Sequence, residues 1–558
     1  MAEYSFFLAS SLEKVFPGKK PQQLPEGELL SLWKNTKGAV QLVYTGDLLA
    51  DGPCAGDFTV TVTGGPCQAE LRKVELIPSD FPCYADADDN YLSKEPGLFP
   101  DLLEPAEPTV IRVLHRQYRS LWISWEIPED AQPGDYPICI TARADSDRGE
   151  VVYENHLTVR VQKAVLPEME LLHTQWFHSD CLAQYYHVKP FSEEHWQILE
   201  NFIRFAAREC SVNMLLTPIF TPPLDTLPDG ERMTIQLVDI FRDNGVYRFD
   251  FTKLERWAGI CRKAGIRCLE ISHLFTQWGA VATPKVVACV DGEMKKIAGN
   301  HVPGNSAEYR YLLEELIPAM RKKLEELGYD REHVYFHISD EPSAEQLESY
   351  RAAKNQVADL LKGCPVMDAL SNLEFYRNGL ITQPVVAIDH IEPFVEEKVP
   401  DLWGYYCCAQ GKKVPNCFFA MPSARNRIMG VLAYQYHLKG FLHWGYNFYN
   451  SQFSRHPIDP YRMTHAEYAF PSGDAFLVYP GPDGKPLASI RSEVLNEGWL
   501  DYRALTLLES LEGRQAVEDL IFRDQNTSMT FTDYPRDAEY LLNLRKHVAE
   551  AIDAHYRT

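Results

Sequence analysis

The feature of this 558-residue chain that most constrains its fold is a regular alternation of short apolar runs with helical segments from about residue 171 onward. The apolar runs are eight candidate strands, at residues 171–176, 213–216, 267–271, 333–338, 366–370, 385–388, 417–420 and 440–444. The helical segments lie at residues 193–209, 252–264, 307–327, 344–362, 424–438 and 492–511, with a helical tail at 537–555. Eight strands that alternate with helices predict a parallel (β/α)8, TIM-like barrel followed by C-terminal helices.

The first part of the chain has a different pattern, in which short apolar runs are separated by Gly, Pro and Asp rather than by helices. Strand-like runs lie at residues 40–44, 58–63, 69–77, 121–127 and 136–142, and residues 151–161 alternate apolar and polar side chains. Alternation with a period of two is typical of a half-buried strand. The sequence therefore predicts a β-sandwich accessory domain over residues 1–166 and a barrel catalytic domain with C-terminal helices over residues 167–558.

The composition excludes several classes of protein. Hydrophobic residues make up 45% of the chain and charged residues 24%, which are ordinary values for a globular protein. The chain has 55 Lys and Arg against 78 Asp and Glu, so its formal charge is −23. Such a surface repels phosphate backbones and anionic membranes, so no nucleic-acid partner is expected, whereas a neutral substrate remains possible.

The cysteines and the N-terminus bear on location. The thirteen cysteines include no CxxC pair and no zinc-finger spacing, which favours reduced thiols over disulfides or a structural metal. Cys407 and Cys408 are interpreted as small buried hydrophobic side chains. Glu3 stands where a signal peptide needs a basic residue, and no apolar run is long enough to span a membrane. A cytoplasmic location without membrane insertion is expected.

The segment HVYFHISDEP, at residues 333–342, is the most informative one for chemistry. An apolar strand runs directly into two neighbouring carboxylates, Asp340 and Glu341. In a (β/α)8 barrel the active site lies at the carboxyl ends of the strands, so acids at this point are candidate catalytic residues. The alternative is structural, because acidic residues are also common at the start of a helix.

Two adjacent carboxylates favour one kind of glycosidase chemistry. The usual pair of acids in a glycosidase approaches the sugar from opposite sides, which neighbouring residues do not readily do. A substrate-assisted mechanism needs a different pair, in which one carboxylate orients a 2-acetamido group and the other acts as acid and then as base.

Four segments carry a resemblance to a known family. They are HISDEP at residues 337–342, GFLHWGYNFYN at 440–450, SGDAFLVYPG at 472–481 and SIRSEVLNEGWLDYRAL at 489–505. In sequence and order they resemble glycoside hydrolase family 123, whose members are β-N-acetylgalactosaminidases with a β-sandwich before a barrel. The similarity extends from about the middle of the first domain to about residue 511.

The resemblance implies an activity and roles for the two acids. It implies a retaining exo-hydrolase that removes terminal β-linked N-acetylgalactosamine (GalNAc) from a glycan or glycoconjugate through an oxazolinium intermediate. Asp340 would orient the acetamido group and Glu341 would be the general acid and base. No metal or cofactor is implied.

Other side chains at predicted strand ends are candidates for sugar binding, because pyranose faces stack on aromatic rings and hydroxyl groups need polar partners. Trp444, Tyr446 and Asn447 follow the last predicted strand, and Trp176 and His178 end the first.

Loops at the same end of the predicted barrel add further candidates. Asp389, beside His390, ends another strand, and Asp474 and Tyr479 lie in a loop rich in Gly and Pro. Trp278, in a long segment after the third strand, is expected either to form a lid or to pack.

Two alternatives remain open at the level of sequence. The first is a β-N-acetylglucosaminidase or a mixed hexosaminidase, because the side chain that reads the sugar C4 hydroxyl group cannot be identified. The second is a carbohydrate-binding protein that has a barrel but does not hydrolyse its ligand. The chain contains no HExxH, GxGxxG, Walker A or GxSxG motif, so a zinc hydrolase, a nucleotide-binding protein and a serine hydrolase have no support.

Overall fold

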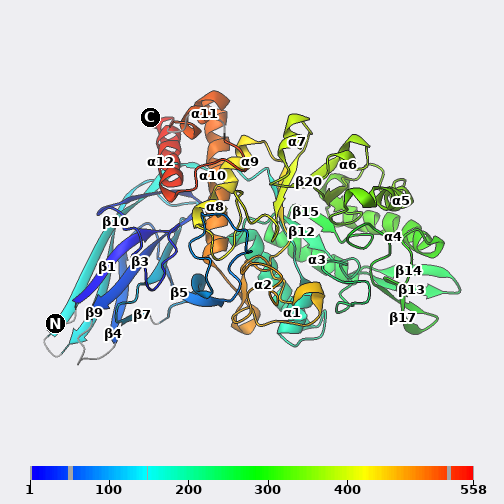
Figure 1. Cartoon of the computed structure of the whole chain (residues 1–558), viewed down its shortest axis with the longest axis horizontal. Coiled ribbons are helices and arrows are strands. Elements are labelled where there is room, and N and C mark those ends of the chain that lie inside the picture. Colours follow the sequence, from blue (N-terminus) through cyan, green and yellow to red (C-terminus); the bar gives the residue numbers. More distant parts are fainter. Residues whose placement is uncertain (1–2, 48–54, 108, 147–148, 524–528, 557–558) are drawn as a thin grey trace. The chain divides into compact units, whose positions relative to one another are not determined.

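The computed structural model describes residues 3–47, 55–107, 109–146, 149–523 and 529–556. The chain forms two compact units, each with its own interior. One unit comprises Met1–Met169, Pro415–Gln435 and Leu487–Thr558, and the other comprises Glu170–Val414 and Tyr436–Pro486. Figure 1 labels the helices and strands of both.

The N-terminal part of the first unit contains two five-stranded sheets. One has the order β1-β3-β8-β5-β6, with β1 Glu3–Ser10, β3 Lys37–Asp47, β8 Arg119–Glu126, β5 Glu70–Ser79 and β6 Gly97–Pro105. The other has the order β2-β10-β9-β4-β7, with β2 Leu29–Lys34, β10 Gly149–Val165, β9 Gly134–Ser146, β4 Ala55–Gly64 and β7 Val110–Leu114. Neighbouring strands are antiparallel except β10 and β2, which are parallel.

The two sheets share one hydrophobic core, as the alternating sequence pattern requires. Leu42 and Trp125 from one sheet and Ile140 and Val159 from the other belong to the same buried cluster. Along β10, Leu157, Val159 and Val161 are buried, while Thr158 and Arg160 between them are partly exposed. This period of two is what places one face of each strand in the core.

The same unit also contains five helices from later parts of the chain, so the compact units do not follow the predicted boundary between residues 166 and 167. These are α8 Ser423–Arg427, α9 Met429–Gln435, α10 Ile490–Glu512, α11 Arg514–Ile521 and α12 Ala538–Ala554. Figure 1 shows α10, α11 and α12 beside one another at the C-terminal end of the chain. The sequence analysis placed all five in residues 167–558, because α8 and α9 lie in the chain between two strands of the parallel sheet and the other three follow its last strand.

Buried ion pairs explain why these helices belong with the sheets. Arg491 on α10 forms a bidentate pair with Asp101 on β6, with both N···O distances 2.9 Å. Glu493, also on α10, accepts from Arg72 on β5 at 2.7 Å. These two ion pairs join the start of the helix to two strands of the sheet. A buried charge needs its partner, so these pairs hold α10 against the strands β5 and β6 of the same unit.

The second unit is built around an eight-stranded parallel sheet with the order β18-β15-β12-β11-β22-β21-β20-β19. The strands are β11 Leu172–Gln175, β12 Met214–Thr217, β15 Cys268–Ile271, β18 Val334–Phe336, β19 Met367–Ala369, β20 Gln383–Ala387, β21 Trp403–Tyr406 and β22 Gly440–His443. A parallel bridge between Phe336 and Val366 joins the two end strands and nearly closes the sheet. Nearly all of their residues are buried, as in parallel sheets covered on both faces.

Seven of the eight predicted strands are present in this sheet, and one was wrong. The predicted strand at 417–420 is a buried loop in the first unit, and the missing strand is β21, Trp403–Tyr406. A short buried apolar run has no periodicity that separates a strand from a packed loop, so sequence alone could not decide between them.

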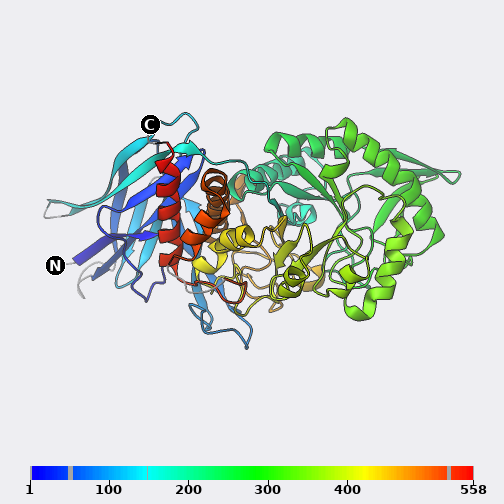
Figure 2. The ribbon, with the colours of Figure 1, turned by 90° about the horizontal axis from the view of Figure 1, so that it is seen from above.

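Helices lie between the parallel strands, and seen from above they surround them (Figure 2). They are α1 Ser179–Tyr185, α2 Glu193–Glu209, α3 Thr252–Ala264, α4 Ala307–Glu326, α5 Leu347–Val357, α6 Glu374–Arg377 and α7 Glu392–Glu396. Short 3₁₀ turns lie at Arg331–His333, Ala344–Gln346, Gln452–Ser454 and Pro482–Gly484. Ser306 caps α4 by accepting from the Tyr309 N–H, and Gly265 ends α3 with φ 92°.

Further strands complete the second unit. A four-stranded sheet consists of β13 Asp239–Asp243, β14 Val246–Asp250, β16 Val286–Val290 and β17 Glu293–Ala298, and β23 is Tyr479–Pro480. The strand β24, Pro486–Leu487, spans the point where the chain leaves this unit. Among the described helices of either unit, none combines the length and the apolar character that crossing a bilayer requires.

Candidate active site

Asp340 and Glu341 lie just beyond the end of β18, in the loop that leads to the next helix. Two backbone hydrogen bonds hold this loop, from Trp278 N–H to the Asp340 carbonyl and from Glu341 N–H to the Ala369 carbonyl, each 3.0 Å. Glu341 has φ 44°, in the left-handed region that side chains other than glycine seldom adopt. Such a conformation persists only where the surroundings impose it, and it is frequent at functional sites.

Asp340 is buried and only half satisfied. Gln277 Nε2 donates to Asp340 Oδ2 at 2.6 Å. Asp340 Oδ1 is buried and has no hydrogen-bond partner among the described residues. Burial, and then the neighbouring charge of Glu341, raise the pKa of Asp340 well above its ordinary value. The free oxygen is an acceptor that a ligand N–H can fill.

Glu341 is held by a tyrosine from a different strand. Tyr405 on β21 donates its hydroxyl hydrogen to Glu341 Oε1 at 2.9 Å. Burial raises the pKa of Glu341, and the bond from Tyr405 partly opposes that rise. A carboxyl group with a raised pKa holds its proton closer to neutral pH, which is what a general acid needs.

Both acids line a cavity of about 790 Å3 at this end of the sheet. This volume includes the open mouth of the cavity. Three of the predicted sugar-binding residues, Trp176, His178 and Trp444, line the same cavity. The structure therefore brings together aromatic rings from β11 and β22 and the carboxylates that follow β18, although these residues are far apart in the sequence.

Asp474 and His178 are tied to the wall of this cavity. Trp444 Nε1 donates to Asp474 Oδ2 at 2.9 Å, and Asp474 itself is fully buried behind Trp444. His178 Nε2 lies 2.9 Å from the Trp444 carbonyl, and Arg232 Nη2 lies 3.2 Å from His178 Nδ1. Burial and the charge of Arg232 lower the pKa of His178 to about 3, so a neutral imidazole donates through Nε2 and accepts through Nδ1.

Three other predicted contacts are not among the residues that line this cavity. Tyr446 is fully buried and donates its hydroxyl hydrogen to the Phe202 carbonyl at 3.0 Å. Asn447 is also buried, and its side-chain amide bonds the backbone N–H and carbonyl of His178 at 2.8 and 3.2 Å. Tyr479 is buried against other aromatic rings. These three side chains are packed in the interior, and Asn447 holds the backbone of His178, which lines the cavity.

Asp389 and His390 lie in a different, neighbouring cavity that also includes Glu341. Asp389 Oδ1 accepts from Gln410 Nε2 at 3.0 Å and lies 2.8 Å from His390 Nδ1. Asp389 was predicted to bind sugar in the same site as the two acids, and it lines this second cavity instead.

Several lining residues were missed by the sequence analysis. Tyr405 belongs to the strand that was not predicted, and Gln277 lies in the long segment after β15. Trp278, for which a lid and packing were both considered, lines the cavity. Its other lining residues outside the predictions include Asp225, Gln452, Phe453 and Phe470. Only the length of the segment after β15 could have directed attention to Gln277 and Trp278, since long loops in compact domains are often functional.

A network of buried charges lies beneath the cavity. Glu270 Oε1 accepts from Trp176 Nε1 at 2.7 Å and from His337 Nε2 at 2.6 Å, and Thr174 donates to its second oxygen at 2.6 Å. His337 Nδ1 lies 3.1 Å from Asp368 Oδ1. Burial by itself would lower the pKa of His337, but the bonds to Asp368 and Glu270 raise it to about 10, so His337 is an imidazolium.

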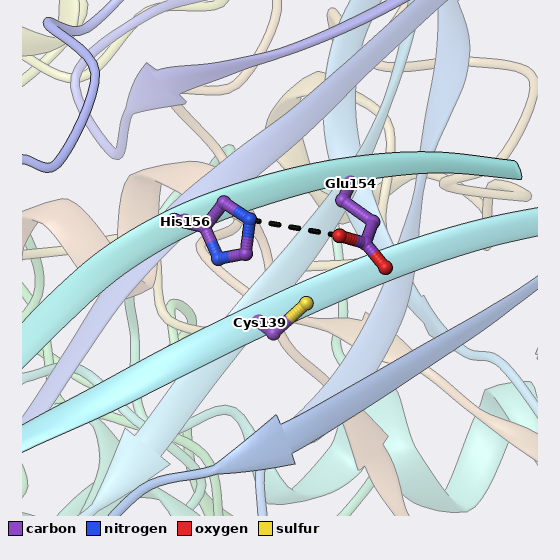
Figure 3. Close-up of side chains that lie close together, drawn as sticks. All are labelled: Cys139, Glu154 and His156. Atoms are coloured by element: carbon purple, nitrogen blue, oxygen red, sulfur yellow. Dashed lines mark ion pairs between the residues drawn. The ribbon is translucent and has the colours of Figure 1, made fainter.

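Two groups among the described residues have side chains close enough to share a metal ion. One is His273, His337 and Asp368, but its two imidazole rings are stacked 4.2 Å apart at 17°, so their in-plane lone pairs do not converge on one point. The other is Cys139, Glu154 and His156 on the outer face of β9 and β10, shown in Figure 3. There His156 Nε2 lies 3.8 Å from Glu154 Oε2, and both side chains are exposed. Neither group lines the cavity of Asp340 and Glu341.

A parallel sheet that is nearly a closed barrel, with paired carboxylates and aromatic rings at its carboxyl end, is the arrangement of a glycoside hydrolase. Residues 176–508 match the profile described as "Glycoside hydrolase 123, catalytic domain". The chain belongs to glycoside hydrolase family 123.

One solved structure agrees with this assignment at the level of fold. A family 123 glycoside hydrolase from Clostridium perfringens, described in a study of glycolipid glycan hydrolysis, superposes with a TM-score of 0.73 at 15% identity, covering 99% of this chain and 97% of that one. A β-glucuronidase from Parabacteroides merdae has a TM-score of 0.31 at 10% identity, covering 90% and 52%. Another from Dictyoglomus thermophilum has a TM-score of 0.32 at 7% identity, covering 87% and 74%. The search of curated proteins found no match.

Proposed function

We propose that the protein is a retaining exo-acting β-N-acetylgalactosaminidase that works by substrate-assisted catalysis. The observation that carries the proposal is the pairing of a half-satisfied buried carboxylate, Asp340, with an adjacent carboxyl group of raised pKa, Glu341, in one cavity. A substrate-assisted mechanism needs two such groups with different roles.

In the first step the carbonyl oxygen of the 2-acetamido group attacks the anomeric carbon. Asp340 Oδ1 accepts the acetamido N–H, which orients the carbonyl oxygen and stabilises the positive charge that develops. Glu341 gives its proton to the glycosidic oxygen as the bond to the leaving group breaks. The product is an oxazolinium ion and a free alcohol.

In the second step water attacks the same carbon. The Glu341 carboxylate takes a proton from the water, the oxazolinium ring opens, and the acetamide is restored. Two inversions at one carbon give net retention of configuration. The aromatic side chains of Trp176 and Trp444 suit the apolar face of the sugar ring.

Related assignments complete the proposal. The substrate is a glycoconjugate with terminal β-linked GalNAc, and the Clostridium perfringens relative, which is described for glycolipid glycans, makes a glycolipid a reasonable first natural substrate to try. The two five-stranded sheets are assigned as a β-sandwich and the parallel sheet as a (β/α)8 barrel, and the location as cytoplasmic.

A panel of 4-nitrophenyl β-glycosides tests the proposal. The GalNAc glycoside is expected to be hydrolysed. The galactoside, which lacks the acetamido group, is not expected to be hydrolysed. A thiazoline analogue of the oxazolinium ion is expected to inhibit, and EDTA is expected to leave the rate unchanged. Faster hydrolysis of the N-acetylglucosamine glycoside would change the sugar assignment, and hydrolysis of the plain galactoside would remove the substrate-assisted mechanism.

A further inference from the structure

A second cavity opens on the other side of Glu341. It encloses about 1050 Å3, including its open mouth. Glu341 and Tyr405 are the two described residues that line both this cavity and the one that contains Asp340. Since Tyr405 donates to Glu341 Oε1 at 2.9 Å, this hydrogen-bonded pair forms a boundary between the two spaces.

Glu341 lies on this boundary, and a general acid must contact the glycosidic oxygen. The glycosidic oxygen has the GalNAc ring on one side and the leaving group on the other, and the acid must reach that oxygen. Asp340, which acts only on the acetamido group, lines the first cavity and not the second. We infer that the second cavity is the subsite for the leaving group. The inference rests on the proposed function, because it takes Glu341 as the acid.

Polar side chains of this cavity have hydrogen-bonding groups to spare. Asn372 Oδ1 accepts from the Glu374 N–H at 2.9 Å, which leaves the Asn372 amide NH2 without a partner among the described residues. Asp389 uses Oδ1 for Gln410 and His390, which leaves Oδ2 as an acceptor. One spare donor and one spare acceptor suit the hydroxyl groups of a sugar.

The charge of the cavity defines the sugar further. Asp389 and Glu341 are its two acidic residues, and no lysine or arginine is among the described residues that line it. Five of the twelve described residues that line it are apolar, and the other seven have polar side chains. The subsite therefore accepts a neutral hexose and disfavours a hexuronic acid, whose carboxylate would lie near Asp389 without a lysine or arginine to balance it.

Three substrates test the inference on the full-length enzyme. They are 4-nitrophenyl β-GalNAc, a disaccharide with GalNAc β-linked to a neutral hexose, and one with GalNAc β-linked to a hexuronic acid. Wild type is expected to prefer the neutral disaccharide by about tenfold or more in kcat/KM. Asp389→Asn keeps the oxygen that Gln410 bonds but removes the charge. It should reduce this preference about fivefold and lower kcat/KM for the neutral disaccharide more than for the aryl glycoside.

A second variant with the opposite effect guards against a mere loss of folding. Asn372→Asp keeps the acceptor for the Glu374 N–H but adds a negative charge, so it should widen the preference against the hexuronic acid. Glu396→Gln removes an exposed carboxylate on α7 that lines neither cavity and should leave the preference unchanged.

The outcomes separate the two proposals. If wild type hydrolyses none of the three substrates, the proposed function is wrong and the subsite with it. If wild type hydrolyses the aryl glycoside but does not discriminate between the disaccharides, the subsite is wrong and the function stands. Equal effects of Asp389→Asn on all three substrates would overturn the subsite in the same way.

Discussion

The acids beneath the active-site cavity and the acids that line it are both buried, but their oxygens are used differently. Both oxygens of Glu270 accept hydrogen bonds, from Trp176 and His337 on one side and from Thr174 on the other. Asp368 is likewise bonded through both oxygens, to His337 and to the Tyr350 hydroxyl at 2.5 Å. Asp340 has one buried oxygen with no partner among the described residues.

The difference shows how to separate structural from functional carboxylates in one barrel. A buried acceptor without a partner costs stability, and Asp340 Oδ1 is such an acceptor on a carboxylate that lines the cavity, where a ligand can reach it. Glu270 and Asp368 already have their partners, and they hold Trp176 and the end of β18 in place. Asp340 and Glu341 are incomplete until a substrate arrives. Three predictions test this contrast.

The largest expected effect is loss of activity on changing the incomplete pair. Asp340→Asn should lower kcat/KM by about a thousandfold for every leaving group, because the acetamido N–H loses its carboxylate acceptor. Glu341→Gln should cost about 10²–10⁴-fold with a poor leaving group and far less with 4-nitrophenolate, which needs no proton. Steady-state kinetics on two aryl glycosides measure both.

A matched control lies at the other end of the same strand. Asp330→Asn removes an exposed carboxylate that pairs with His333, and the kinetics should not change. Full activity of either Asp340→Asn or Glu341→Gln would contradict the roles assigned to them.

The second prediction concerns stability and the charges beneath the cavity. His337→Gln removes the imidazolium between two buried carboxylates and should lower the free energy of unfolding by about 3–5 kcal/mol. His333→Gln, at the exposed pair with Asp330, should cost about 0–1 kcal/mol. Urea unfolding followed by tryptophan fluorescence compares them, and similar losses for both variants would refute the contrast.

The difference in unfolding free energy between wild type and His337→Gln is expected to depend on pH in one direction. The folded-state pKa of His337, about 10, lies above the ordinary value of 6.5. Its stabilising contribution is therefore fully present below about pH 6.5 and is lost as the pH rises towards about 10. The gap in unfolding free energy between wild type and His337→Gln should shrink over that interval, and a gap that grows would be inconsistent with a buried imidazolium.

The smallest effect is expected from Tyr405→Phe. The Tyr405 hydroxyl stabilises the charged form of Glu341, so its loss should raise the pKa of Glu341 further. Because the acid must be protonated, the alkaline limb of kcat/KM should move to higher pH, by about 0.5–1 unit. Tyr406→Phe, at the next residue of the same strand and outside both cavities, is the control and should not move it. A shift to lower pH in Tyr405→Phe would show that the hydroxyl does not act on Glu341 in this way.

Much of the fold could be predicted because its signals are local. The helices Glu193–Glu209 and Thr252–Ala264 have the predicted bounds, since Ser192 caps the first and Gly265 ends the second. The strand β21 was missed because four aromatic and glycine residues carry no periodicity. Because this strand was missed, Tyr405, which donates a hydrogen bond to Glu341, was missed as well.

The sequence by itself determined that β18 delivers Asp340 and Glu341 side by side, because strand, acids and the following turn are contiguous in the chain. Only the tertiary structure decided which of the other candidates face the cavity. Trp176, His178 and Trp444 do, while Tyr446 and Asn447 are buried behind it. It also decided that α10 belongs with the sheets through Asp101 and Arg491. The physical reason is the same in each case: the direction of a side chain after a strand ends, and the partner of a buried charge, depend on residues that are distant in sequence and adjacent only after folding.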